Sequence, residues 1–190
     1  YQPSPEKLEL IKEKVDRLGC QSNQPVLERN NLHAQTGKLD RKGKELNSKN
    51  CVKLLFDMAT TLVFYNLDHE KGLELSRNLA EDFGHVDSMV ACGIVLVEGL
   101  GVPPHEQEGI FWLQRAIEVG NNAQALYELA TLYYTGLEVV LPEDPGKAFE
   151  LFEKAAKQNH AGAMYMMADC LVEGEGCQKS VARAVPLFYK

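Results

Sequence analysis

Carboxylate pairs are the first residues of this chain whose type and spacing could support chemistry. Glu98 and Glu173 stand in similar sequence surroundings, and Glu143 is followed directly by Asp144. Two neighbouring carboxyl groups could serve as a general acid and a general base. However, Glu98 and Glu173 each precede a glycine at the end of an apolar helical pattern, and Asp144 precedes Pro145, as a helix cap does. These carboxylates are therefore predicted to mark helix ends and not a catalytic site.

The histidines and cysteines could hold a metal ion or supply a nucleophile, but their spacing argues against both. The histidines lie mostly at the ends of expected elements, without a HisxxxHis pair or a nucleophile motif: His33, His69, His85, His105 and His160. The cysteines show neither CxxC spacing nor a zinc pattern: Cys20, Cys51, Cys92, Cys170 and Cys177. We predict solvated histidines and reduced thiols, with no catalytic residue, metal site or cofactor. A bridge between Cys170 and Cys177 is the minor alternative.

The composition fits one domain with a continuous apolar core. Of the 190 residues, 45% are hydrophobic and 25% are charged. The longest uncharged apolar run, residues 89–97, is about half of the roughly 18 residues that a membrane-spanning helix needs, so no transmembrane segment is expected and a peripheral place on a membrane complex stays open. Residues 51–190 carry a net charge of −10 and residues 1–50 one of +3. The acidic part argues against nucleic acid as a partner.

The two termini suggest where the natural protein extends. The chain begins with Tyr1, and no secretory pattern follows it. Lys190 falls inside an expected helix, so we expect the natural chain to continue beyond it. An intracellular location is favoured, and an organelle, a mitochondrion or plastid, stays open because Tyr1 could follow a removed transit segment.

A repeat with a period of 37 to 38 residues supplies the elements that must position these side chains. Gly99, Gly136 and Gly174 each follow an apolar helical segment and precede a short loop and a second segment. Such a period is typical of a helical solenoid, in which each unit buries its apolar face only against its neighbours.

The segment before each glycine has one apolar face of a 3.6-residue helix. Counting back from the glycines, the positions eleven and six residues before them hold small residues, and the positions seven and three residues before them hold mostly large apolar residues. They are Ser88, Ala125 and Ala163; Cys92, Leu129 and Met167; Gly93, Ala130 and Ala168; and Leu96, Tyr133 and Leu171. The sequence therefore predicts a first helix whose inner face alternates small and large side chains.

The segment after each loop predicts a second helix with its own register. Its inner positions are Gly109, Ala148 and Ala184; Trp112, Leu151 and Leu187; Leu113, Phe152 and Phe188; and Ala116 and Ala155. Asp144 is the clearest cap, with Asp68 and Ser180 at equivalent places. Gly120 and Asn159 are expected to close these helices with positive φ, and Pro186 should kink the last one.

The upstream part continues the pattern less clearly. Gly72, Leu75 and Leu79 match the second-helix register, preceded by a helical segment over about residues 51–65. We expect an N-terminal region over 1–50, with a short amphipathic helix at 5–18 and an extended arm, and a solenoid over 51–190. The solenoid would have units over about 51–85, 86–121, 122–159 and 160–190, the last incomplete.

This pattern resembles the Sel-one-like repeat, a relative of the tetratricopeptide repeat. The third unit carries most of the family pattern in Ala125, Leu129-Ala130, Tyr133, Gly136, Val139, Lys147-Ala148, Phe152 and Ala155-Ala156. Glu138 departs from the family's second glycine. The resemblance implies an all-α fold, a right-handed superhelical solenoid of antiparallel helix pairs.

The resemblance also implies a function. Proteins of this family are scaffolds and adaptors that hold other proteins in larger assemblies, so we expect a non-catalytic, protein-binding subunit or assembly factor, in an organelle complex among other settings. The alternative is the secreted, cysteine-rich subgroup to which hydrolase activity was attributed. It is disfavoured because its cysteine positions hold Ala155-Ala156 and Ala163-Met164 here.

The outward positions of the first helices are the candidate partner-binding surface. If the units stack as tetratricopeptide-like pairs, the positions nine, five and two before each glycine line the concave side. They are Val90, Ile94, Val97, Tyr127, Thr131, Tyr134, Tyr165, Asp169 and Val172. Tyrosines with aliphatic neighbours suit an apolar peptide or helix. Two alternatives remain: these side chains fill the solenoid interior, or the basic residues 1–50 make the partner contact.

Overall fold

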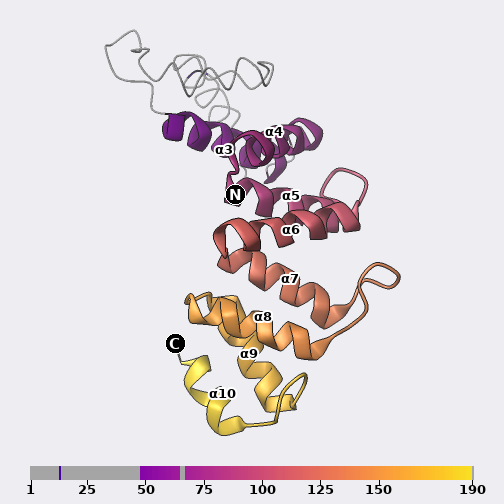
Figure 1. The fold of residues 1–190 in the computed structure, drawn as a ribbon, viewed down its shortest axis with the longest axis vertical. Coiled ribbons are helices and arrows are strands. Elements are labelled where there is room, and N and C mark those ends of the chain that lie inside the picture. The colour runs from indigo at the N-terminus through magenta and orange to yellow at the C-terminus, as the bar shows by residue number, and fades with distance from the viewer. Residues whose placement is uncertain (1–12, 14–47, 65–66, 190) are drawn as a thin grey trace. The chain divides into compact units, whose positions relative to one another are not determined.

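The computed structural model describes residues 13, 48–64 and 67–189 of the chain. The predicted helix over 5–18 and the predicted arm lie almost entirely outside the described residues, as do Cys20, His33 and Lys190. All named elements in the described ranges are α-helices (Figure 1): α3 Ser48–Phe64, α4 His69–Phe83, α5 Val86–Glu98, α6 Glu106–Gly120, α7 Ala123–Thr135, α8 Pro145–Lys157, α9 Ala161–Glu173 and α10 Val181–Phe188. None of them is long and apolar enough to cross a bilayer. The prediction of an all-α fold is confirmed for these residues.

The chain divides into two compact units. The N-terminal unit comprises Tyr1–Val95 and Gly99–Pro104, and the C-terminal unit comprises Leu96–Glu98 and His105–Lys190. The first therefore holds α3, α4 and most of α5, and the second holds α6 to α10.

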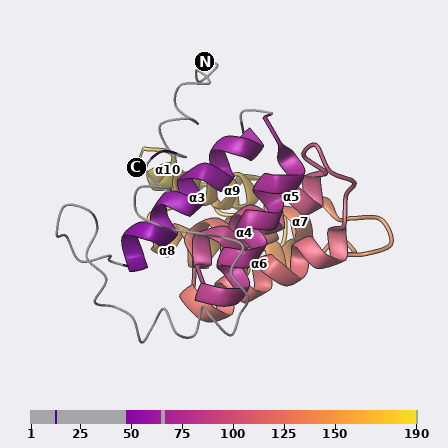
Figure 2. The same ribbon diagram turned by 90° about the horizontal axis from the view of Figure 1, so that it is seen from above.

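In the N-terminal unit, α3 and α4 lie side by side and share an apolar core (Figure 2). Leu55 and Ala59 of α3 meet Leu75 and Leu79 of α4 there. Gly72 permits the close approach, since a Cβ at this position would lie 2.6 Å from Val63 Cγ2. The Asp68 carboxylate accepts a hydrogen bond from the Lys71 amide at 3.0 Å, which confirms Asp68 as the cap of α4.

In the C-terminal unit, each helix from α6 to α10 packs against the next along the chain. The predicted small positions, Ala125, Ala130, Ala148, Ala155, Ala163, Ala168 and Ala184, are completely buried. Phe152 is also completely buried among them and is the largest such side chain. The predicted alternation of small and large side chains is therefore the packing principle of this unit, because the small residues make room for the large ones.

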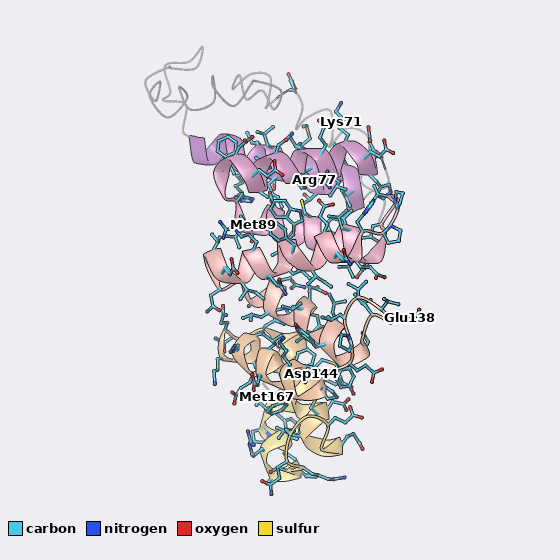
Figure 3. The ribbon with its side chains drawn as sticks, turned by 45° about the vertical axis from the view of Figure 1, so that its right-hand side comes forward. Lys71, Arg77, Met89, Glu138, Asp144 and Met167 are labelled. Carbon is cyan, nitrogen blue, oxygen red and sulfur yellow. The ribbon has the colours of Figure 1, made fainter. Side chains whose placement is uncertain are left out.

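The helix ends match the predictions in part. Gly99 and Gly174 adopt the left-handed conformation that ends α5 and α9. Gly136 has a positive φ of 72° but an extended ψ of 162°, so the chain leaves α7 in a different direction. It then forms a short bridge between Leu137 and Leu141. This difference follows the longer loop of the third unit, whose tip carries Glu138 (Figure 3).

The second glycine of the loop allows the loop to approach the start of the second helix of the preceding repeat. A Cβ at Gly176 would lie 1.9 Å from the carbonyl oxygen of Pro145, the first residue of α8. A Cβ at Gly101 would lie 2.1 Å from Cδ2 of His69, at the start of α4. Glu138 takes this place in the third unit, where the extended loop carries it to the surface.

Two predictions about the ends of the second helices need correction. Gly120 is the last residue of α6, and Asn121 takes the left-handed conformation there with φ 45°. Asparagine tolerates this conformation better than most residues; Asn159, with φ 63°, behaves as expected. Ser180 occupies the predicted N-cap position of α10, but its side chain makes no cap hydrogen bond.

The last helix keeps Ala184 buried as predicted, but its end is less covered than predicted. Pro186 lies inside α10. Phe188, predicted to be interior, is 45% exposed, whereas Phe152 at the equivalent place in α8 is buried. The reason is that α9 packs on α8, while no described element follows α10.

Candidate functional site

The predicted surface residues of the N-terminal unit lie on α5 and differ in exposure. Val90 is buried, with 6% of its surface exposed, and Ile94 is half-buried. Val90 therefore offers little surface to a partner.

In the C-terminal unit, the predicted surface residues lie on α7, on α9 and at the end of α5. Tyr165 is 58% exposed. The others are half-buried: Val97, Tyr127, Thr131, Tyr134, Asp169 and Val172. The Thr131 hydroxyl is directed to its own helix, because it donates to the Tyr127 carbonyl at 3.0 Å.

Tyr127 belongs to the contact between the third and fourth repeats. Its ring stacks on the imidazole of His160 with centroids 4.7 Å apart, and lies 6.0 Å from the ring of Phe152. His160 precedes α9 and caps it: its Nδ1 accepts from the Ala163 amide at 3.1 Å, and its Nε2 lies 2.9 Å from Oε1 of Gln124. This arrangement requires neutral imidazole with the proton on Nε2, and partial burial lowers the pKa of His160.

Tyr134 connects α7 with the loop that follows α9. Its hydroxyl donates to the carboxylate of Glu175, and its ring lies 6.4 Å from that of Phe152 in an edge-on arrangement. The hydrogen bond to Glu175, followed by burial and the charges of Glu175 and Asp169, raises the pKa of Tyr134 to about 12. Glu175 was not among the predicted site residues; the available signal was a carboxylate held between two loop glycines.

Tyr165 is the most accessible aromatic ring of this surface. It contacts Phe188 of α10 edge-on at 5.6 Å, and the equivalent pair one repeat earlier, Tyr127 and Phe152, is tilted at 6.0 Å. Because Tyr165 remains 58% exposed after this contact, much of its surface is available to another molecule.

The charges of α7 and α9 are all negative. α7 contains Glu128, and α9 contains Asp169 and Glu173, while neither helix contains Lys or Arg. Burial raises the pKa of Glu128, the hydrogen bond from Gln124 lowers it, and the charge of Glu98 raises it further. The surface therefore combines tyrosine rings with carboxylates, on two helices that carry no Lys or Arg.

Two histidines have a role that the sequence did not predict. His85 precedes α5 as His160 precedes α9, and its Nδ1 accepts from the Ser88 amide at 3.3 Å. Burial lowers the pKa of His85, and the charge of Asp87 raises it. The signal was present in the sequence, since a histidine directly precedes both helices, but histidine is an uncommon cap.

The cysteine side chains that the structure describes show no features of a nucleophile. Cys92, Cys170 and Cys177 form no disulfide bond, and the Cys177 thiol donates to the Cys170 carbonyl at 3.4 Å. Burial raises the pKa of Cys170 to about 11, so its thiolate is scarce near neutral pH. Within the described ranges, no three His, Cys, Asp or Glu side chains lie close enough to hold a metal ion.

Comparison with known proteins gives the same repeat. The Sel1 repeat profile matches residues 86–121, 123–160 and 161–190, more than half of the chain. The fold resembles the crystal structure of a Sel1 repeat protein from Oxalobacter formigenes, with a TM-score of 0.64 and 20% identity over 87% of this chain and 68% of that one. It also resembles c5321, a protective antigen of uropathogenic Escherichia coli with an SLR fold, with a TM-score of 0.64 and 20% identity over 88% of this chain and 32% of that one. The predicted helical-repeat solenoid is confirmed.

The chain is also similar to parts of longer curated proteins. Protein SHC1 of Saccharomyces cerevisiae is 30% identical over 121 residues, which make up 56% of this chain and 24% of SHC1. Chitin synthase regulatory factor 2 of Schizosaccharomyces pombe is 32% identical over 90 residues, 45% of this chain and 17% of that protein. The chain thus spans about a quarter or less of these relatives.

Proposed function

Because the chain belongs to the Sel1 repeat family, we propose that it is a non-catalytic scaffold that holds other proteins together as a peripheral subunit or assembly factor of a larger complex. Sel1 repeats mediate protein–protein interaction, and the family is generally one of non-catalytic scaffolds. The single observation that carries the proposal is a recurring helix pair whose outward first-helix positions keep accessible tyrosine surface, most of all Tyr165.

The names of two relatives support a regulatory form of this role. Chitin synthase regulatory factors 2 and 3 of Schizosaccharomyces pombe share 32% and 26% identity with the matched parts of this chain. A repeat scaffold that recruits or positions chitin synthase is a narrower candidate. Its test is whether chitin synthase co-purifies with the tagged chain in fission yeast. If the synthase is absent from the purified material, this candidate is removed and the general scaffold role stands.

Tyr165 is the best position at which to test the surface. Tyr127 and Tyr134 both flank Phe152, so alanine at either position would reduce stability together with binding. Tyr165 is 58% exposed on a first helix, and Phe111 is 55% exposed on the second helix α6. The two residues form a matched pair of accessible aromatic positions within one unit.

The experiment places a benzophenone photo-crosslinking amino acid at residue 165 or at residue 111 and irradiates cells that express the chain. We expect defined crosslinked proteins from position 165 and none of them from position 111. Equal or stronger crosslinking from position 111 would show that partner proteins contact the second helices and not the first. Deletion of residues 1–45 tests the remaining alternative, because loss of the same crosslinks would place the contact in the N-terminal region.

A further inference from the structure

The first helices of the C-terminal unit carry negative charge without a cation on the same helices. Glu128 and Asp169 are half-buried, and Glu173 is exposed at the end of α9. The lysines and arginines that the structure describes in this unit lie on α6, α8 and α10 or in the loop before α10. Of these, Lys179 comes next to the acidic face, since its Cβ lies 3.2 Å from the point that a Cβ at Gly174 would occupy. The charge of Glu98 acts on Glu128, and those of Asp169 and Glu175 act on Tyr134. A cation that approaches these carboxylates would be attracted by each of them, and more strongly where they are partly desolvated.

Aromatic surface lies beside these carboxylates. The Tyr134 hydroxyl holds the Glu175 carboxylate next to its ring, and Tyr165 of α9 exposes more than half of its surface. An aromatic ring beside a fixed carboxylate suits an ammonium or guanidinium group, since the ring face attracts the cation and the carboxylate accepts its hydrogen bonds.

We propose that the outward face of α7 and α9 binds a cationic segment of a partner protein, in which Lys or Arg alternates with apolar side chains. This inference rests on the proposed scaffold function and names the chemistry of its partner. Charge complementarity selects this occupant. A wholly apolar helix would cover the carboxylates and leave them unpaired, and an acidic segment or a phosphate backbone would be repelled. Val172 and the accessible part of the half-buried Tyr127 ring provide the apolar contact.

The test uses the full chain and two labelled peptides. In one, arginine alternates with leucine; in the other, neutral citrulline replaces each arginine at nearly unchanged shape. Fluorescence anisotropy at low and physiological ionic strength measures binding of both. The variant Asp169→Asn/Glu173→Gln removes two charges from α9. The matched control Glu118→Gln/Glu150→Gln removes two charges from exposed positions on α6 and α8. Far-UV circular dichroism and the urea midpoint establish that each variant is folded.

We expect the arginine peptide to bind and the citrulline peptide to bind at least tenfold more weakly. The α9 variant should weaken binding of the arginine peptide about tenfold, and the control variant should leave it unchanged. Tyr165→Leu should weaken it severalfold without removing it. Equal binding of the two peptides, no binding of the arginine peptide at low ionic strength, or an equal loss in both charge variants would overturn the proposal.

The outcome is separable from that of the scaffold proposal. If position 165 crosslinks to partner proteins while the arginine peptide fails to bind, the scaffold function stands and the cationic specificity is wrong. If crosslinks come only from position 111, the surface itself is wrong.

Discussion

His160 joins a local role to a contact between repeats. Its imidazole caps α9, stacks on Tyr127 and reaches Gln124 of the preceding first helix. The capping hydrogen bond needs an unprotonated Nδ1, so the folded state favours the neutral form of the imidazole. His85 has the same requirement at the start of α5.

The two caps predict acid sensitivity. Since burial lowers the folded-state pKa of His85 and His160 below the ordinary 6.5, the unfolded chain takes up protons first as the pH falls. Their contribution is present above about pH 6.5 and decreases as the pH falls from there through the lowered folded-state values. Urea unfolding at pH 7.5 and 5.5 should therefore show a smaller decrease for His160→Asn, which retains a capping side chain without a titrating group. An unchanged decrease would show that the cap does not titrate in this range.

The Tyr134 hydroxyl predicts a second effect at the residue scale. Tyr134→Phe keeps the ring beside Phe152 and removes the hydrogen bond to Glu175. We expect a loss of about 1 kcal/mol in the free energy of unfolding, typical of one partly exposed hydrogen bond, measured by urea denaturation. Glu175→Gln keeps an acceptor and should cost less; a larger loss for the glutamine variant would contradict this assignment.

At the scale of the elements, the loops decide how closely neighbouring segments approach. Gly176 has φ +65° and lies against the Pro145 carbonyl, whereas Gly84 has φ +60° and, apart from its chain neighbours, no atom within 4 Å of the point that a Cβ would occupy. A substitution at Gly84 therefore tests the left-handed backbone conformation alone, and one at Gly176 tests it together with a steric clash.

This comparison predicts unequal effects of alanine. Gly84→Ala should cost about 1 kcal/mol from the left-handed conformation alone. Gly176→Ala should cost at least about 2 kcal/mol, since the loop or the start of α8 must also move. Urea unfolding measures both, and equal losses would mean that the loop shifts away from α8 without cost.

At the scale of the whole molecule, the stability of each helix should depend mainly on the helices that it packs against. In repeat folds each element is stabilised mainly by the elements next to it. Phe152 is completely buried beside α7 and α9, and the α3–α4 pair has its own core of Leu55, Ala59, Leu75 and Leu79.

Phe152→Ala should therefore act mainly on one unit. We expect a loss of about 3 to 5 kcal/mol, with faster amide hydrogen exchange in α7, α8 and α9 and unchanged exchange in α3 and α4. Mass spectrometry of the exchanging chain locates the effect. Equal acceleration in both units would show that they unfold as one.

The sequence by itself determined the helix pairs, their buried faces and the family. These features follow from a 3.6-residue period and from small residues such as Ala125 and Ala163 at fixed distances from a glycine, which are local properties of the chain. The direction taken after Gly136 was not predictable in this way, since it depends on where the Leu137–Leu141 loop packs.

Only the tertiary structure decided how much of each outward residue is accessible. Tyr127, Tyr134 and Tyr165 are equivalent in their helical register, yet the first stacks on His160, the second bonds to Glu175 and the third is 58% exposed. The helical period fixes the direction of a side chain. Its coverage depends on groups such as Glu175, 41 residues away from Tyr134, which only the packing of successive repeats brings into contact.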